Sequence, residues 1–103
     1  MSAAAENENT PAETVADNAA MDRYEIKTDG QVLGFAAYRT RPDGAVVFTH
    51  TEIDGAHEGQ GLGSRLARGA LEDIQAAGGS VVPRCPFIKG YIDRHPEFQG
   101  LIR

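Results

Sequence analysis

The sequence predicts a compact single domain of the α/β (α+β) class, with elements in the order β-β-β-α-β-α and a mixed, mostly antiparallel sheet. Apolar and polar residues alternate with a period of two in segments between residues 23 and 53, and turn signals at Asp29-Gly30 and Pro42-Asp43-Gly44 separate these segments. From Leu62 the apolar period becomes that of a helix. A chain of 103 residues has room for one small core.

Residues 1–20 are rich in Ala, Glu and Asn and contain no aromatic residue, so they are predicted to form a disordered acidic tail that precedes a domain at residues 21–103. The tail has no Lys or Arg and four acidic residues, Glu6, Glu8, Glu13 and Asp17. Of the formal net charge of −5, the tail carries −4, which leaves −1 on the domain. A nucleic-acid-binding protein would carry a basic surplus, so no nucleic-acid partner is expected.

The composition also predicts a cytoplasmic protein without a membrane partner. No apolar run reaches the length of a membrane span, and the N-terminus lacks the basic and apolar regions of a secretion signal. Cys85 is the single cysteine, so it forms no internal disulfide and suits a reducing compartment.

The first strand carries Tyr24, Ile26 and Thr28 on one face, and the second, 32–38, is apolar on both faces like a central strand. The third strand covers 45–53. Strict alternation would place its side chains on two faces, with Val46, Phe48, His50 and Glu52 on one and Val47, Thr49, Thr51 and Ile53 on the other.

The helical region begins at Gly61 and ends at Gly78-Gly79. One side of this helix is apolar, with Leu62, Leu66, Ala67, Ala70, Leu71 and Ile74. Residues 80–83 form a short strand, which is expected to run parallel to the third strand because a helix intervenes. Pro86 suits the first position of a second helix that reaches about His95, and this places Cys85 at its N-cap.

Glycines alternate at positions 59, 61 and 63, where the third strand passes into the helix. Backbone N–H groups and the positive end of the helix dipole meet at such a turn, so it favours a phosphate, although a simple tight turn is the alternative. The ATP-binding Gly-x-x-x-x-Gly-Lys motif is excluded because no Lys lies between Lys27 and Lys89. The dinucleotide fingerprint also fails in its spacing, and no residues have metal-ligand spacing.

The segment HTEIDGAHEGQGLGSRLARGAL resembles the central motif of GNAT-type N-acetyltransferases, with Glu58-Gly-Gln-Gly-Leu-Gly63 aligned to Gln/Arg-x-x-Gly-x-Gly/Ala. Together with VVPRCPFIKGYIDRHPEF, it resembles the short YjdJ-type GNAT subfamily over nearly all of residues 21–103. The resemblance implies that acetyl-CoA is the cofactor, that CoA is the product, and that the sheet splays open between its third and fourth strands. The implied cofactor-binding residues are Thr51, Ile53, Glu58, Gly59, Gln60, Gly61, Leu62, Gly63, Ser64 and Arg65. Glu58 departs from the pattern, because a carboxylate beside a diphosphate is unfavourable unless it is paired or turned away.

Four residues are candidates for the chemistry. Glu52 and His50 share a strand face, and either is suited to remove a proton from an amine, directly or through water. The resemblance implies that Tyr91 acts as the general acid that protonates the departing thiolate, while packing in the core is the alternative. Cys85 at a helix N-cap is a candidate nucleophile, because the dipole favours the thiolate; burial as an inert core thiol is the alternative.

Two functions therefore follow from the sequence. The first is an acetyl-CoA-dependent N-acetyltransferase that acts on a primary amine of a small molecule or a protein. The second is a non-catalytic module that binds CoA or acetyl-CoA and serves as a sensor or as a partner of another protein. The sequence predicts neither the acceptor nor the oligomeric state.

Overall fold

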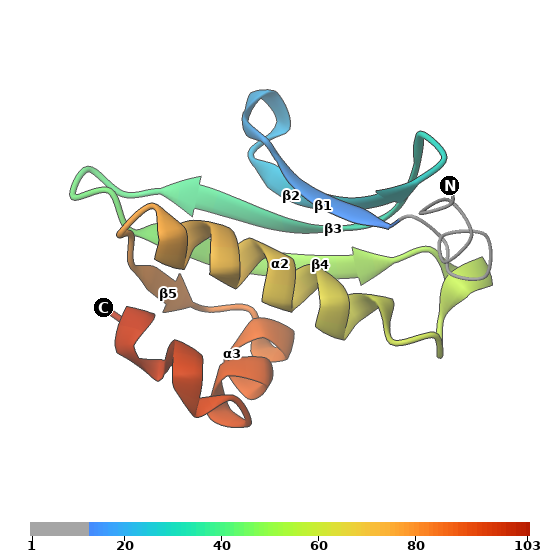
Figure 1. Ribbon diagram of the computed structural model, residues 1–103. Coiled ribbons are helices and arrows are strands. Elements are labelled where there is room, and N and C mark those ends of the chain that lie inside the picture. The colour runs from blue at the N-terminus through green and yellow to red at the C-terminus, as the bar shows by residue number, and fades with distance from the viewer. Residues whose placement is uncertain (1–12) are drawn as a thin grey trace, which may run out of the picture.

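The computed structural model describes residues 13–103 and forms one mixed sheet with its helices on one face (Figure 1). The strands are β1 (Thr14–Asn18), β2 (Arg23–Thr28), β3 (Gln31–Thr40), β4 (Val46–Ile53) and β5 (Val81–Pro83), and they lie in this order across the sheet. The helices are α2 (Leu62–Ala76) and α3 (Pro86–Asp93), with short 3₁₀ turns at Ala19–Met21, Gly55–His57 and Pro96–Leu101. The α/β class and the predicted elements from β2 to α3 are confirmed.

One strand was not predicted. The sequence assigns residues 14–20 to a disordered tail, but Thr14–Asn18 form β1, which pairs antiparallel with β2. Side-chain contacts also bind β1 to the domain: Val15 packs so closely on α2 that a Cβ at Gly69 would lie 2.6 Å from it, and the Tyr38 hydroxyl donates to Asp17 over 2.6 Å. These tertiary contacts override a sequence of low strand propensity. The rest of the predicted tail, residues 1–12, lies outside the described residues.

A bulge at Thr49 corrects the predicted faces of β4. The register of β3 against β4 passes from Ala37↔His50 to Tyr38↔Phe48, which leaves Thr49 without a partner. The extra residue reverses the alternation, so that Phe48 and Ile53 both pack against the core under α2. His50 and Glu52 still share a face, but it is the face opposite Phe48.

The sheet opens between β4 and β5, as predicted. Their parallel pairing covers only Val46↔Val81 to Phe48↔Pro83, after which the backbone N–H of Cys85 donates to the carbonyl oxygen of Phe48 over 2.9 Å. Beyond that point β4 continues to Ile53 without a strand partner on this side. Figure 1 shows the two strands diverging, and α3 follows β5 at the point where they separate.

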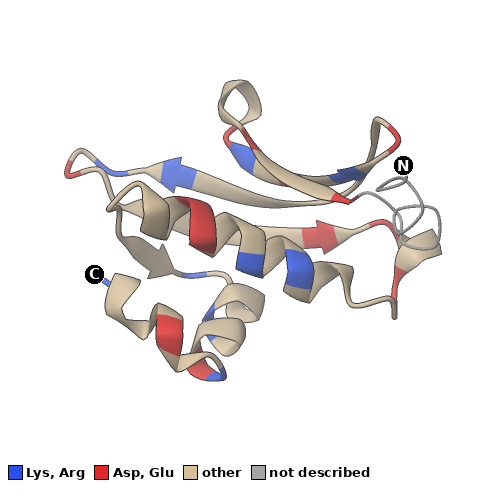
Figure 2. Cartoon of the chain, in the orientation of Figure 1, with Lys and Arg blue, Asp and Glu red and all other residues tan. Residues whose placement is uncertain are grey.

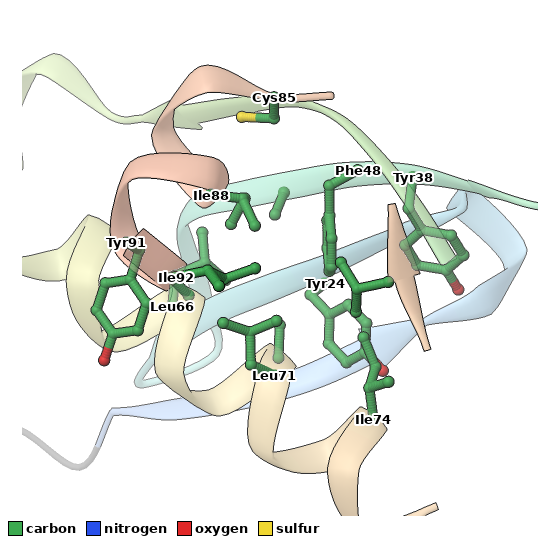
Figure 3. Close-up of a cluster of buried hydrophobic side chains, with 14 of the residues drawn as sticks. Tyr24, Tyr38, Phe48, Leu66, Leu71, Ile74, Cys85, Ile88, Tyr91 and Ile92 are labelled. Atoms are coloured by element: carbon green, nitrogen blue, oxygen red, sulfur yellow. The ribbon is translucent and has the colours of Figure 1, made fainter. Parts of the chain in front are cut away.

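The core lies between the sheet and both helices. Phe48 is fully buried at its centre, and its ring lies 6.2 Å from that of Tyr24 and 6.3 Å from that of Tyr38, centroid to centroid (Figure 3). The predicted apolar side of α2 is buried in full, and α3 adds Ile88, Tyr91 and Ile92. The hydroxyl of Tyr24 donates to Asp73 on α2 over 2.6 Å, and burial together with this carboxylate raises the pKa of Tyr24 far above its usual range.

Glu25 is the one buried charged residue among those described, and it makes the stability sensitive to acid. Burial acts to raise the pKa of Glu25, but hydrogen bonds from Arg23 (2.8 Å) and Asn18 (3.0 Å) outweigh it and hold this pKa below the usual range. The unfolded chain therefore binds the proton more readily, and the stabilisation, complete above the unfolded pKa of about 4.3, is lost as the pH falls through the lower folded value.

We expect Glu25→Gln to lose stability at pH 7 and to flatten the dependence of stability on pH below about 4.3. Urea unfolding of both proteins at pH 7 and pH 3 measures the effect. Glu72→Gln is the control, since Glu72 is an exposed member of an ion pair on α2. An equal pH dependence in the wild type and Glu25→Gln would show that the Glu25 contacts contribute nothing.

Candidate functional site

A pocket of about 350 Å³ opens where β4, the start of α2 and the start of α3 meet. Eight of the ten predicted cofactor residues line it: Thr51, Ile53, Glu58, Gly59, Gly61, Leu62, Gly63 and Ser64. Its other lining residues are His57 and Phe87. The residues predicted from the sequence therefore form one wall of the pocket. They come from the end of β4 and from the loop that leads into α2.

The loop presents unpaired hydrogen-bond donors. No backbone N–H of residues 59–64 donates to another group in the described part of the chain, and the first α2 bond runs from the N–H of Arg65 to the carbonyl of Gly61. Gly61 is the N-cap, so no side chain caps the helix. The positive end of the helix dipole adds to these donors, and the arrangement favours an anion.

The structure gives different reasons for glycine at the three alternating positions. Gly59 and Gly61 have φ angles of 85° and 76°, a conformation that residues with a Cβ rarely adopt. At Gly63 a Cβ would lie 2.8 Å from the ring of Phe87, so glycine allows the close contact between α2 and α3 seen in the structure. Gly63 therefore makes room for a side chain of α3, whereas Gly59 and Gly61 allow the backbone conformation of the loop.

Gln60 and Arg65 are the predicted cofactor residues that do not line the pocket. Arg65 reaches back over the loop, with one guanidinium nitrogen 3.3 Å from the position of a Cβ on Gly61. Its guanidinium is held by both carboxylate oxygens of Glu13, at 2.6 and 3.1 Å. Arg65 therefore lies beside the candidate anion site but is already paired with the segment that leads into β1.

His50 and Glu52 lie together on the sheet face that no helix in the described part of the chain covers. The Nε2 of His50 and a carboxylate oxygen of Glu52 are 2.7 Å apart, and both side chains are more than half exposed. The ring of Phe35 on β3 meets His50 edge-on, at 6.2 Å between centroids. The pair is therefore accessible from the side of the sheet opposite the glycine loop.

Cys85 is the N-cap of α3, as predicted, and is buried with 2% exposure. Its Sγ lies 3.2 Å from the hydroxyl of Thr51, one of the pocket residues. No basic side chain in the described part of the chain bonds to the thiol. Cys85 thus lies behind the pocket wall rather than on its surface.

Tyr91 does not line the pocket. It is 2% exposed and stacks on His95, with ring centroids 3.8 Å apart, and its ring lies 6.2 Å from that of Phe98. Phe87, one turn earlier on α3, occupies the wall of the pocket instead. His95 follows the C-cap residue Arg94 and bonds back to the helix, because its Nδ1 lies 2.7 Å from the carbonyl oxygen of Tyr91.

Sequence reasoning missed two lining residues. His57 is half-buried and lines the pocket from the 3₁₀ turn before the loop, and Phe87 lines it from α3. The signal for Phe87 was its position directly after the Cys85-Pro86 helix start, which turns it toward α2. Within residues 13–103 there is neither a group of three or more His, Cys, Asp or Glu suited to a metal ion nor a helix of the length and apolarity that a membrane crossing requires.

Fold and site together define a small protein with a candidate anion-binding loop beside the point where β4 and β5 separate. A sequence profile of the GCN5-related N-acetyl-transferase family matches residues 23–101, which is most of the chain. The chain therefore belongs to the GCN5-related N-acetyl-transferase family. A comparison with curated proteins finds no significant match.

Proposed function

We propose that this protein is an acetyl-CoA-dependent N-acetyltransferase that transfers an acetyl group to a primary amine. The observation that carries the proposal is the loop at residues 59–64: its backbone N–H groups have no acceptor within residues 13–103, and all of its residues but Gln60 line the pocket. We also propose that the chain is of the short YjdJ-type subfamily and acts in the cytoplasm.

Two features of the pocket support the coenzyme as its ligand. Main-chain donors at the start of α2 suit a diphosphate, and the more apolar wall formed by Ile53, Leu62 and Phe87 suits a pantetheine arm. Glu58 also lines the pocket, so its carboxylate must turn outward when a diphosphate binds. When bound, acetyl-CoA supplies the acetyl group as an activated thioester.

In this proposal, residues on one face of the sheet bind the acetyl donor and residues on the other face remove the proton from the acceptor. We propose that the glycine loop and the core-side residues of β4 hold the donor, and that the acetyl group reaches the other face where the pairing of β4 with β5 ends at Phe48. Glu52, with His50 bonded to it, takes the proton from an ammonium group that arrives on the uncovered face. A neutral amine is the nucleophile, so removal of this proton is necessary.

Titration calorimetry with CoA and acetyl-CoA, followed by thiol release over a panel of primary amines, tests the proposal. We expect saturable binding of both and thiol release that depends on the amine. Absence of binding would contradict the proposal.

The alternative is a module that binds CoA without turnover. It is favoured by the position of Tyr91, which is stacked on His95 and does not line the pocket, so Tyr91 is not placed to protonate a thiolate there. Saturable binding without amine-dependent thiol release would establish this alternative.

We propose direct transfer rather than an acetyl-cysteine route, because the Cys85 thiol is buried and bonds only to Thr51. Cys85→Ala is therefore expected to retain turnover within about threefold, with some loss of stability from the small cavity. Thiol-release rates and CoA affinity of the purified variant measure this. Lost turnover with unchanged CoA affinity would instead indicate a covalent role for Cys85.

A further inference from the structure

A second cavity, of about 290 Å³, lies at the other end of the uncovered sheet face and is lined by three arginines. Arg39 comes from β3, Arg41 from the turn that follows it, and Arg84 from the residue after β5, while Val47 and Pro42 supply apolar wall. These segments are distant in sequence, and Figure 2 shows the basic positions at the end of β3 and after β5. The fold therefore gathers positive charge at one place.

Within residues 13–103, two of the three guanidinium groups are free of ion pairs and can bind a ligand. Arg41 is bonded to Asp43 over 2.7 Å, and Arg103 contacts the same carboxylate at 3.2 Å. Neither Arg39 nor Arg84 forms an ion pair with any residue in 13–103. Arginine binds carboxylate and phosphate groups through paired N–H donors, so this cavity suits a small anion.

The cavity is within reach of the proposed proton acceptor. Val47 lies in its wall, and His50 follows three residues later on the same strand, a separation of about 10 Å or less at the rise of an extended chain. Because the bulge at Thr49 reverses the alternation, Val47 and His50 point to the same, uncovered face. One extended molecule can therefore touch both the His50–Glu52 pair and the arginines.

We propose that the acceptor is a small primary amine that also carries a carboxylate or phosphate group, and that Arg39 and Arg84 bind this anionic group. The proposal rests on the proposed acetyltransferase function and adds its substrate class. Binding of the anion at the arginines places the amine at the opposite end, beside Glu52. An amine without the anion lacks this anchor and is a poorer substrate.

The test compares hexylamine, 6-aminohexanol, 6-aminohexanoate and 6-aminohexyl phosphate as acceptors. We expect kcat/KM to be about tenfold or more higher for an anionic amine than for the neutral-tailed pair, as for other hydrogen bonds to charged groups. The anionic amine with the higher kcat/KM then shows whether the cavity prefers a carboxylate or a phosphate group. Arg39→Gln/Arg84→Gln should abolish the preference and leave hexylamine turnover within twofold, whereas Arg94→Gln, an exposed arginine outside the cavity, should keep it.

A titration with inorganic phosphate, followed by amide NMR, tests the cavity independently of turnover. We expect saturable shifts at Val47 and Arg84 that the double variant loses, distinct from any shifts in residues 59–64. Equal kcat/KM for all four amines would overturn the proposal, and so would a preference for the anionic amines that survives in the double variant. In both cases thiol release would still support the acetyltransferase function. If no amine is used, the phosphate shifts decide: their absence at Val47 and Arg84 overturns the anion site.

Discussion

The Glu52→Gln variant is expected to lose about 100-fold or more of its kcat for amine acetylation, while its affinity for CoA stays unchanged. The amide keeps the shape of the side chain but cannot take the proton from the incoming ammonium group. Glu52 lies on the face opposite the glycine loop, so the loss should fall on turnover alone. Initial rates of thiol release with a saturating amine, together with CoA calorimetry, measure both quantities.

Glu72→Gln provides the matched control, because it removes the same charge from the exposed side of α2, where Glu72 pairs with Arg68 at 3.3 Å. Its kcat should remain within about twofold of the wild type, as for a surface substitution. A Glu52→Gln enzyme that keeps most of its turnover at neutral pH would show that another group accepts the proton. His50→Asn would then identify or exclude the imidazole as that group.

The Phe48→Ala variant is expected to lose about 3–5 kcal/mol of folding free energy. Phe48 is fully buried among Tyr24, Tyr38 and residues of both helices, so the truncation leaves a cavity in the centre of a small core (Figure 3). Small domains have about 5–15 kcal/mol in total, and the variant would be close to unfolded at 37 °C. Urea and thermal unfolding followed by circular dichroism measure the loss.

Phe35→Ala removes the same atoms from the uncovered face of the sheet, where Phe35 is only partly buried beneath Arg23. Its expected cost is less than half that of Phe48→Ala, because a smaller apolar area returns to water. Equal losses for the two variants would contradict the assignment of the core to the helical side of the sheet.

Most of the fold could be predicted from local pattern, because alternation, turn residues and the apolar side of α2 are encoded within short segments. Two features could not. β1 is a strand because Val15 fits against Gly69 and Asp17 accepts from Tyr38, and neither contact is visible in a segment of Ala, Asn and Asp. The bulge at Thr49 interrupts a regular alternation, and nothing in that stretch of sequence marks the extra residue.

The candidate site divides in the same way. The glycine loop was predictable, because positive φ angles and a helix start leave a clear sequence signature. The place of Tyr91 was not, because Phe87, one turn nearer the start of α3, lies against Gly63 and lines the pocket, while Tyr91 packs on His95. The arginine cavity joins β3 and the end of β5, and only the sheet order brings these two segments to the same face.

Amide NMR of the labelled protein during titration with CoA tests the central claim most directly, because it observes the backbone N–H groups themselves. We predict that the largest saturable shifts fall on the amides of residues 59–64, with smaller ones at Thr51 and Ile53. Saturation with those loop amides unmoved, or with the shifts confined to Arg39 and Arg84, would contradict the claim that main-chain donors at the start of α2 bind the coenzyme diphosphate.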